Sequence, residues 1–295
     1  MSSGRPHEAR RAATLNVTFY GVRGSTPGCE PSVQRYGGNT ACVTLEAPGL
    51  DPVIFDLGTG LRFFGESLVG ADQPFRGLAL VTHLHWDHVQ GLPFFTPIHR
   101  TGSSLAIHGR SDGCSLGDAF RTFMHPPFFP VGPQDLAGDI TFDDFEGTEL
   151  EWGRARVTAA DVPHTGPTNG YRVEIDGLSV VYVSDHQQPA DPTYVDPAVL
   201  ELCRDADLLI HDAQYEPHEF AMKSDWGHCT VDYAVRVAAE SGARRLVLFH
   251  HDPSHSDDTI DRLLNEARSM AEGTSVLEVQ AASEGLTVAL SSALV

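Results

Sequence analysis

The sequence contains very little lysine: Lys223 is the single lysine among 20 basic residues, and 40 acidic residues give a net charge of −20. The arginines form no cluster larger than the pairs Arg10–Arg11 and Arg244–Arg245. Proteins that bind large nucleic acids normally carry a basic surface that neutralises phosphates. The composition therefore disfavours a large nucleic acid as a partner.

Long apolar runs and paired cysteines are also absent from the sequence. No apolar run approaches the roughly 18 residues that a membrane-spanning helix needs, and the first residues lack the apolar middle of a secretory signal. The five cysteines are scattered and include no CxxC pair, which is typical of reduced thiols. We therefore expect a cytoplasmic protein without a membrane segment. In it, residues 1–14 form a flexible tail and residues 15–295 form one domain.

Short apolar segments bounded by Gly, Pro or Asp follow one another through most of the chain, as strands do. The expected strands are 15–22, 41–47, 52–58, 77–83, 104–109, 156–164, 171–175, 178–185, 206–212 and 245–251. Two late segments show helical spacing: 230–242 with Thr230 as N-cap, and 256–273 with Ser256 as N-cap. This order predicts sheets covered by helices in an α/β arrangement. The Gly-, Pro- and Phe-rich stretch at 110–148 is expected to be an ordered insertion.

A hexad directly after one of these strands, HLHWDH at 83–88, holds three histidines and an aspartate. Imidazole and carboxylate groups are common ligands of divalent ions. Later strand-like segments also end on such residues, at His164, Asp185, His211–Asp212 and His250–His251. Of the last pair we prefer His250, because it is the first residue after the strand. Since sites in α/β proteins gather where strands end, the sequence predicts that these side chains meet at one metal site.

The hexad and its surroundings, THLHWDHVQGLP, resemble the signature of the metallo-β-lactamase fold. Further motifs resemble this family in the same order: IFDLGTGLR, VPHTGPTNGYRV, VYVSD and LVLFHHDP. The stretches LLIHDAQY and WGHCTVDYA resemble motifs of its phosphodiesterase branch, which includes ribonuclease Z and hydrolases of cyclic nucleotides and small phosphodiesters. The resemblance implies a four-layer αβ/βα sandwich, in which two mixed sheets lie face to face and are covered by helices.

The resemblance also implies two divalent metal ions. One would be held by His83, His85 and His164, the other by Asp87, His88 and His250, and Asp185 would bridge them. Imidazole with carboxylate suits Zn²⁺, although Mn²⁺ or Fe²⁺ can occupy such a set. Histidine at position 85, where the oxygen-reducing di-iron branch has glutamate, favours hydrolysis over redox chemistry.

The implied activity is hydrolysis of a small phosphodiester, a cyclic nucleotide or similar, by a hydroxide that bridges the two ions. Three residues are candidates for catalysis. His228 is the candidate general acid, and Asp212, which stands where the branch has glutamate, is expected to orient it. Asp87 is a candidate in addition to its role as a ligand.

Four other polar residues lie in or near these motifs. We expect Asp56 and His211 to support the site without binding metal, His186 to be no ligand, and His255 to lie at the surface. The sequence leaves open whether His186, His211 or the Phe-rich segment 120–130 contacts the substrate.

Other functions remain open at this point. The same metal pair would also hydrolyse a lactone or another carboxylic ester, and a protein with this fold can act as a metal-dependent sensor without catalysis. Processing of tRNA 3′ ends is disfavoured, because the sequence contains no counterpart of the long basic arm with which the ribonuclease branch holds tRNA. A homodimer also stays open, since relatives are often dimers.

Overall fold

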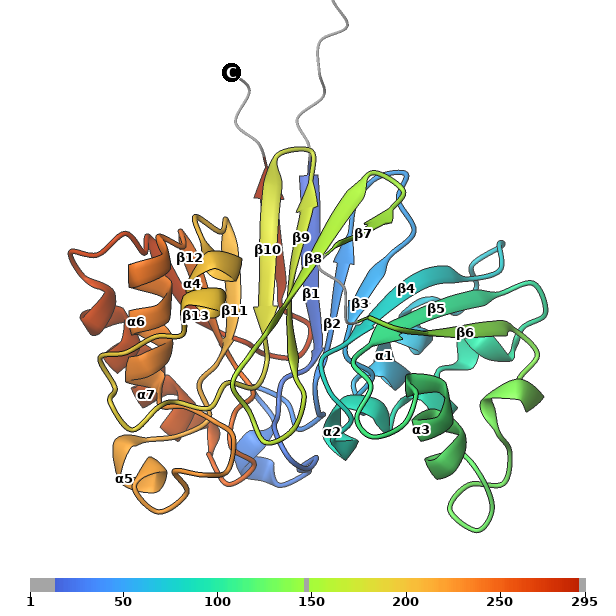
Figure 1. Cartoon of the computed structure of the whole chain (residues 1–295), viewed down its shortest axis with the longest axis horizontal. Coiled ribbons are helices and arrows are strands. Elements are labelled where there is room, and N and C mark those ends of the chain that lie inside the picture. Colours follow the sequence, from blue (N-terminus) through green and yellow to red (C-terminus); the bar gives the residue numbers. More distant parts are fainter. Residues whose placement is uncertain (1–13, 146–148, 292–295) are drawn as a thin grey trace, which may run out of the picture.

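The computed structural model describes residues 14–145 and 149–291, so residues 1–13 of the predicted tail lie outside the described residues. The described residues form two sheets of seven strands each. Figure 1 shows helices on the outer side of both sheets, at the left and at the right of the view. This arrangement confirms the predicted α/β sandwich of two mixed sheets. In the described residues, no helix combines the length and the apolar character needed to cross a membrane.

The first sheet has the strand order β14-β1-β2-β3-β4-β5-β6. Its strands are β1 (Thr14–Gly21), β2 (Cys42–Glu46), β3 (Val53–Phe55), β4 (Arg76–Val81), β5 (Ser104–Gly109), β6 (Asp139–Asp144) and β14 (Thr287–Ser291). Strands β3 to β6 run parallel, whereas β14, β1 and β2 are antiparallel to their neighbours. The parallel strands therefore all end at one edge of this sheet.

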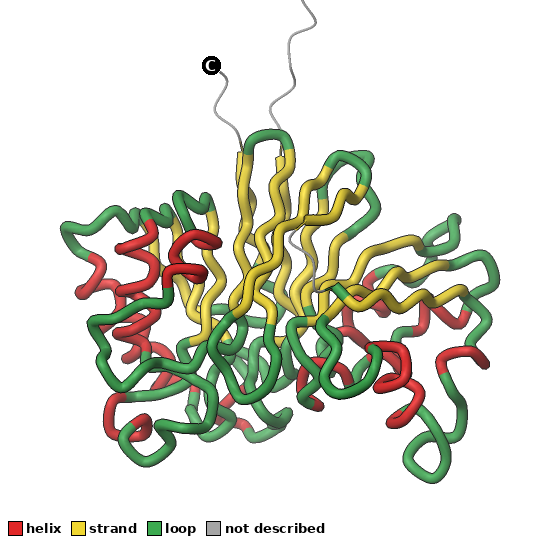
Figure 2. The backbone as a smooth tube through the Cα atoms, viewed as in Figure 1, coloured by secondary structure: helices red, strands yellow, loops and turns green. Residues whose placement is uncertain are grey.

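The second sheet has the order β13-β12-β11-β10-β9-β8-β7. Its strands are β7 (Glu149–Trp152), β8 (Ala155–Asp161), β9 (Asn169–Ile175), β10 (Leu178–Val183), β11 (Leu208–Asp212), β12 (Arg245–Phe249) and β13 (Glu278–Ala281). Strands β10 to β13 run parallel. Figure 2 shows loops gathered below the strands of both sheets, which is where strand-end residues can meet.

Helices cover the outer faces of both sheets. The α-helices of the described residues are α1 (Leu61–Ser67), α2 (Trp86–Val89), α3 (Leu116–Phe123), α4 (Pro197–Cys203), α5 (Pro217–Phe220), α6 (Val231–Ser241) and α7 (Asp257–Ala271), and of these α5 has no buried residue. Short 3₁₀ turns occur at Pro31–Val33, Leu92–Phe94, Thr96–His99 and Pro133–Asp135. Apolar residues of α1 and α3 pack on the first sheet, and those of α4, α6 and α7 pack on the second.

The main core lies between the two sheets. Alternate residues of β1, namely Leu15, Val17 and Phe19, are fully buried in it, as expected for a strand with one face toward another sheet. The ring of Phe55 from the first sheet stacks on Tyr182 from the second, with centroids 4.9 Å apart. This packing fixes the position of the strand ends that carry the candidate site.

Both helices predicted from the sequence are present with the predicted caps. The hydroxyl of Thr230 accepts a hydrogen bond from the backbone N–H of Tyr233, and that of Ser256 accepts one from Thr259. Helix α6 ends at Gly242, whose φ of 77° is a left-handed conformation that glycine adopts without a steric penalty.

The sequence prediction found ten strands and missed four: β6, β7, β13 and β14. These four are the edge strands of the two sheets in the described residues. An edge strand is covered on fewer sides, so it carries more polar residues and lacks the apolar run that marks a central strand. Strand β6 and helix α3 both come from the stretch 110–148, which therefore completes the first sheet and its cover.

Candidate metal centre

The seven side chains predicted as metal ligands lie together where the strands of the two sheets end. His83 follows β4, His85 directly precedes α2, and His164 lies between β8 and β9. The remaining four are Asp87 and His88 in α2, Asp185 after β10, and His250 after β12. Five of the seven are buried, while His85 and His164 are more exposed. One cluster is thus assembled from both sheets.

Two glycines allow the backbone to approach the rings of this cluster. A Cβ atom at Gly24 would lie 2.5 Å from the ring of His250, and one at Gly227 would lie 2.3 Å from the ring of His164. His250 itself has a φ of 58°, a left-handed conformation that costs a non-glycine residue energy. The surrounding contacts therefore hold His250 in a strained conformation that aims its ring at the cluster.

The ligand atoms form two groups with Asp185 between them. Those of His83, His85 and His164 lie within 4.8 Å of one another, as do those of Asp87, His88 and His250. Asp185 faces both groups, one carboxylate oxygen to each. Its Oδ2 is 3.9 Å from Nε2 of both His83 and His164, whereas its Oδ1 is 3.2 Å from Nε2 of His88 and 3.5 Å from Nε2 of His250.

Two facing imidazoles indicate that a cation fits the second group. Nδ1–H of His88 donates to Oδ2 of Asp56 at 2.7 Å, and Nδ1–H of His250 donates to the amide oxygen of Gln214 at 2.8 Å. In the neutral rings both Nε2 atoms then carry lone pairs, and these atoms face each other at 3.2 Å. The lone pairs repel, and a positive ion between them would remove that repulsion.

Unpaired polar atoms give a second, independent test of the fit. Nε2 of His83 and Oδ1 of Asp185 are buried and have no hydrogen-bond partner among the described residues. Buried polar atoms without partners are rare and costly, and a bound ion is one of the usual reasons for them. Imidazole nitrogens and carboxylate oxygens are also the donors that Zn²⁺, Mn²⁺ and Fe²⁺ accept. The residues present therefore fit divalent metal ions.

The electrostatics of the cluster shift the pKa values of its members in different ways. Burial raises the pKa of Asp87, but His88 and His250 beside it outweigh burial and hold that pKa well below its usual range. Burial lowers the pKa of His83, which keeps its ring neutral. His88 behaves differently: burial lowers its pKa, but three neighbouring carboxylates raise it well above the ordinary value. The surroundings of His88 thus favour positive charge, which a metal ion would supply.

Several groups outside the seven orient them, which metal ligands generally require. Asp56 is fully buried. Its Oδ2, which contacts His88, also accepts a hydrogen bond from the Tyr182 hydroxyl at 2.9 Å. The backbone carbonyl of Gly227 accepts from Nδ1–H of His164 at 2.7 Å. The backbone N–H of Ser25 donates to Oδ2 of Asp87 at 2.7 Å. Gln214 and Ser25 were not found from the sequence, because nothing in their sequence context distinguishes them.

His228 and Asp212 make the contact that the sequence predicted. Nδ1 of His228 lies 3.0 Å from Oδ2 of Asp212. The same oxygen accepts a hydrogen bond from the backbone N–H of His186, and Oδ1 of Asp212 accepts one from the backbone N–H of Gln214, each at 3.0 Å. Burial lowers the pKa of His228, but Asp212 outweighs burial and raises it above the ordinary value. With Nδ1–H committed to Asp212, the other ring nitrogen of His228 is free for chemistry in the pocket that this residue lines.

The other histidines are placed differently. His211 and His186 are fully buried, and their rings contact each other at 3.0 Å, outside both ligand groups. Nε2 of His251 contacts the carbonyl of Ala282, also outside these groups. The expectation that His255 lies at the surface is wrong: it is 4% exposed and its ring contacts Glu219 of α5 at 3.0 Å. The loop after β12 packs against α5, a tertiary contact that local sequence does not reveal.

A cavity of about 510 Å³ opens onto the cluster. Its lining includes His85, Asp87, Asp185 and His228, and it also includes residues that sequence reasoning missed: Ser25, Leu84, Trp86 and Trp226. Trp86 lies inside the hexad and Trp226 two residues before His228, so proximity to predicted site residues was an available signal. Among the described residues, no arginine or lysine lines this cavity.

Comparisons with known proteins agree with this geometry. Residues 59–251 match the family described as the beta-lactamase superfamily domain. Ribonuclease Z of Natronomonas pharaonis is 28% identical over an alignment of 297 positions, gaps included, and the alignment covers 83% of this chain and 89% of that protein. The metallo-beta-lactamase fold protein YhfI of Bacillus subtilis has a TM-score of 0.69 at 19% identity, covering 94% of this chain and 100% of YhfI. A diphosphatase from the PhnP family has a TM-score of 0.66 at 19% identity, covering 95% of this chain and 99% of that one.

Proposed function

This chain belongs to the beta-lactamase superfamily and is a metal-dependent hydrolase, and on that basis we propose that it hydrolyses small phosphodiesters with a pair of divalent metal ions. Cyclic nucleotides are included in this class. The observation that carries the proposal is the position of Asp185, which presents one carboxylate oxygen to each of the two groups of ligand atoms. A single-ion site would not need a carboxylate that faces two groups.

Each group of side chains would hold one ion. His83, His85 and His164 would bind the first, Asp87, His88 and His250 the second, and Asp185 both. Zn²⁺ is the first choice because the donors are mostly imidazoles, with Mn²⁺ or Fe²⁺ as alternatives. When bound, such a pair lowers the pKa of a water toward neutrality and stabilises charge on the oxygens of the reacting group.

The charge of the site supports an anionic ester as the substrate. Asp87 and Asp185 are the only acidic residues among the seven side chains, so two divalent ions would leave the site with a net positive charge. That charge attracts a phosphodiester, which is an anion, more strongly than it attracts a neutral lactone. The absence of arginine and lysine from the described cavity lining means that the ions themselves would have to bind the phosphate.

His228 would act as the general acid. Its Nδ1–H is held by Asp212, so the proton would leave from Nε2 to the oxygen of the departing alcohol. Asp212 would keep the ring in this orientation and stabilise its protonated form, as a carboxylate paired with a histidine generally does. Its two backbone hydrogen bonds fix the carboxylate, so the shorter aspartate still reaches the ring.

RNA is the second candidate substrate, because the relative from Natronomonas pharaonis is named Ribonuclease Z. The net charge of −20 argues against a large polyanion and supports a small one. We also propose a cytoplasmic location, which the five cysteines support because none of them forms a disulfide.

The test compares leaving groups in zinc-loaded protein and in its His228→Ala variant. A cyclic nucleotide loses an alkoxide, which needs a proton, whereas bis(p-nitrophenyl) phosphate loses a phenolate that needs little help. We expect His228→Ala to lower turnover of the cyclic nucleotide by about 10²- to 10⁴-fold, with a much smaller effect on the p-nitrophenyl ester and the same metal content. His218→Ala, a change at an exposed histidine outside the cluster, serves as the matched control.

Four results would contradict the proposal. Equal losses on both esters would assign His228 a structural role. Turnover of a homoserine lactone that is indifferent to His228→Ala would identify a carboxylic-ester hydrolase, and faster cleavage of precursor tRNA than of any small ester would identify a ribonuclease. Absence of all hydrolysis by fully metal-loaded protein would indicate a sensor.

A further inference from the structure

A second cavity, of about 480 Å³, lies next to the metal cavity. Seven of its nine lining residues are apolar. Most of them are aromatic: Trp86, Phe94, Phe123, Phe128 and Phe129. They come from α2, the 3₁₀ turn after it, α3 and the loop after α3, and Figure 1 shows α2 and α3 as neighbours at the lower edge of the molecule. We call this cavity the aromatic pocket.

The aromatic pocket and the metal cavity adjoin each other at one shared lining residue. Trp86 lines both cavities, and it stands between His85 and Asp87, two of the seven clustered side chains. A molecule with a phosphoryl group at the metal site and a substituent directed past Trp86 would therefore occupy both cavities at once.

The phenylalanines of the segment 120–130 lie in two different places. Phe120 is fully buried in the core beneath the first sheet, whereas Phe123, Phe128 and Phe129 line the pocket.

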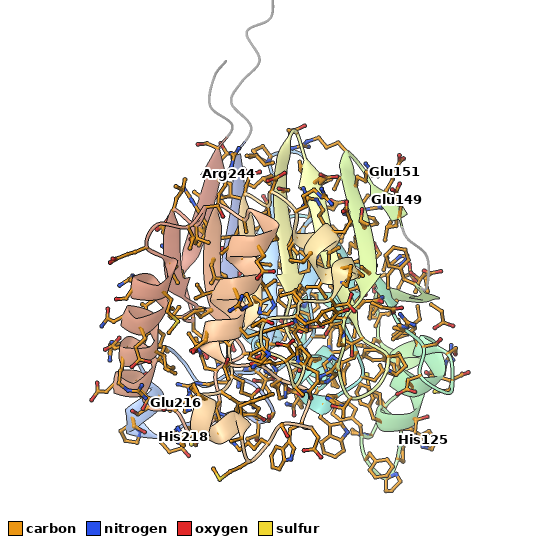
Figure 3. All side chains as sticks on the ribbon, turned by 60° about the vertical axis from the view of Figure 1, so that its left-hand side comes forward. His125, Glu149, Glu151, Glu216, His218 and Arg244 are labelled. Atoms are coloured by element: carbon orange, nitrogen blue, oxygen red, sulfur yellow. The ribbon has the colours of Figure 1, made fainter. Side chains whose placement is uncertain are left out.

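The pocket exposes an unusual amount of apolar surface. Trp86 is 75% exposed, Phe94 55% and Phe128 76%. Clustered apolar side chains left open to water usually mark a binding site, because water contact at such a patch is unfavourable. The loop that carries Phe128 contains a closed turn, in which the carbonyl of His125 accepts from the backbone N–H groups of both Phe128 and Phe129. Figure 3 labels His125, the first residue of this turn, at the end of the molecule opposite Arg244.

The lining determines which chemistry fits. Among residues 14–145 and 149–291, no charged residue lines the aromatic pocket, and its polar residues are Gln90 and Thr122. The hydroxyl of Thr122 donates to the backbone carbonyl of Asp118 at 2.8 Å, so Gln90 is left as the main polar group. A nucleobase would bury several hydrogen-bonding groups here with few partners, which is costly, whereas a hydrocarbon has none to satisfy.

We propose that the aromatic pocket binds an apolar hydrocarbon substituent of the substrate, so that the preferred phosphodiesters carry an alkyl chain or unsubstituted aryl group. This inference rests on the proposed phosphodiester hydrolysis and narrows its substrate class. The hydrocarbon covers the exposed faces of Trp86, Phe94 and Phe128, and the phosphoryl group reaches the metal site beside Trp86. Discrimination among small phosphodiesters then arises from apolar contact with the 480 Å³ pocket, not from base recognition.

The test uses p-nitrophenyl phosphodiesters whose second ester group is methyl, butyl or hexyl, so the leaving group is constant. A half-buried CH₂ group strengthens binding about twofold. The value of kcat/KM should therefore rise at least about tenfold from the methyl to the hexyl ester. We expect Phe128→Ala and Phe94→Ala each to reduce the hexyl-to-methyl ratio several-fold. Leu277→Ala, which removes an apolar side chain that is 82% exposed outside the pocket, should leave the ratio unchanged.

The outcomes separate this inference from the proposed function. If no phosphodiester is hydrolysed, the proposed function fails. If all three esters are hydrolysed with similar kcat/KM, or if the ratio is the same in Phe128→Ala, the inference is wrong while the function stands. A cyclic nucleotide that surpasses the hexyl ester would also overturn the inference, because it would show recognition of the base. Circular dichroism of each variant checks the fold, and because Phe94 and Phe128 are both exposed, neither substitution removes a core side chain.

Discussion

Among single residues, Asp56 has the most connected position next to the metal centre. Its carboxylate accepts hydrogen bonds from the ring of His88, the hydroxyl of Tyr182 and the backbone N–H of Thr82, the last at 2.8 Å. Its φ of 57° is unusual for a residue other than glycine. The surrounding structure maintains this conformation, which holds Nδ1 of His88 at Asp56 and directs Nε2 of the same ring toward the cluster.

Replacing Asp56 with asparagine should therefore weaken metal binding. The amide offers no negative charge to the Nδ1–H of His88, so the ring becomes a poorer ligand and is less firmly oriented. We expect a loss of about 10- to 100-fold in affinity for Zn²⁺, measured by competition with a chromophoric chelator. Asp51→Asn, a change at an exposed aspartate outside the cluster, should have no effect. Equal affinities of Asp56→Asn and the parent protein would show that the contact has no influence on the metal.

Sequence reasoning was effective for residues whose neighbours in the chain carry the signal. The seven clustered side chains follow strand ends, and parallel strands bring such ends together, so their proximity could be predicted. The burial of His255 and the orientation of His250 by Gln214 depend on loops that pack against each other, 36 residues apart in both cases. Such contacts between distant loops cannot be predicted from neighbouring residues in the sequence. The aromatic pocket beside Trp86 was not predicted for the same reason.

At the scale of elements, prediction succeeded for central strands and long helices. Central strands such as β10, in which all six residues are buried, stand out as apolar runs. The four missed strands are edge strands, and β6 illustrates the reason, because none of its residues is fully buried. Helices α6 and α7 were predicted because Thr230 and Ser256 are N-cap residues placed directly before a helical pattern.

The two N-caps should contribute unequally to stability. Ser256→Ala should lower the free energy of unfolding by about 1 kcal/mol through the lost bond to Thr259. Thr230→Ala should cost more, because the Thr230 hydroxyl also donates to the buried side-chain oxygen of Gln188 at 2.9 Å. Urea unfolding provides the measurement. Ser269→Ala, the same change at an exposed position within α7, is the control and should change stability by no more than a few tenths of a kcal/mol.

The order of these effects is the informative result. A loss of stability in Ser269→Ala as large as in Ser256→Ala would contradict the capping role. A smaller loss for Thr230→Ala than for Ser256→Ala would show that the hydroxyl contact with Gln188 contributes nothing.

At the scale of the whole molecule, the metal centre joins the two sheets. His83, His85, Asp87 and His88 follow the first sheet, whereas His164, Asp185 and His250 follow strands of the second. Arg23 makes a further connection: it lies after β1, and its buried guanidinium donates to the carbonyls of Asp252 and His255 after β12. Bound ions would therefore stabilise the contact between the sheets as well as serve catalysis.

Metal removal should for this reason lower thermal stability. An ion that binds only the folded protein adds about 4 kcal/mol when its concentration is about a thousand times its Kd. In a chain of this size, a loss of 1 kcal/mol in the free energy of unfolding lowers Tm by about 2 °C. Chelation should therefore lower Tm by about 8 °C or more. Differential scanning calorimetry with and without a chelator measures the change. The Asp185→Asn variant should show a smaller decrease, and an identical Tm in both conditions for the parent protein would contradict the expectation.

The most direct test of the central claim is to count and locate the ions. Protein purified with excess Zn²⁺ and freed of loose metal would be examined by elemental analysis and by an anomalous difference map at the zinc absorption edge. We predict two ions per chain, about 3.5–4 Å apart, with Asp185 in contact with both. A cluster that holds a single ion, or a map without a peak between Asp185 and the histidines, would contradict the account.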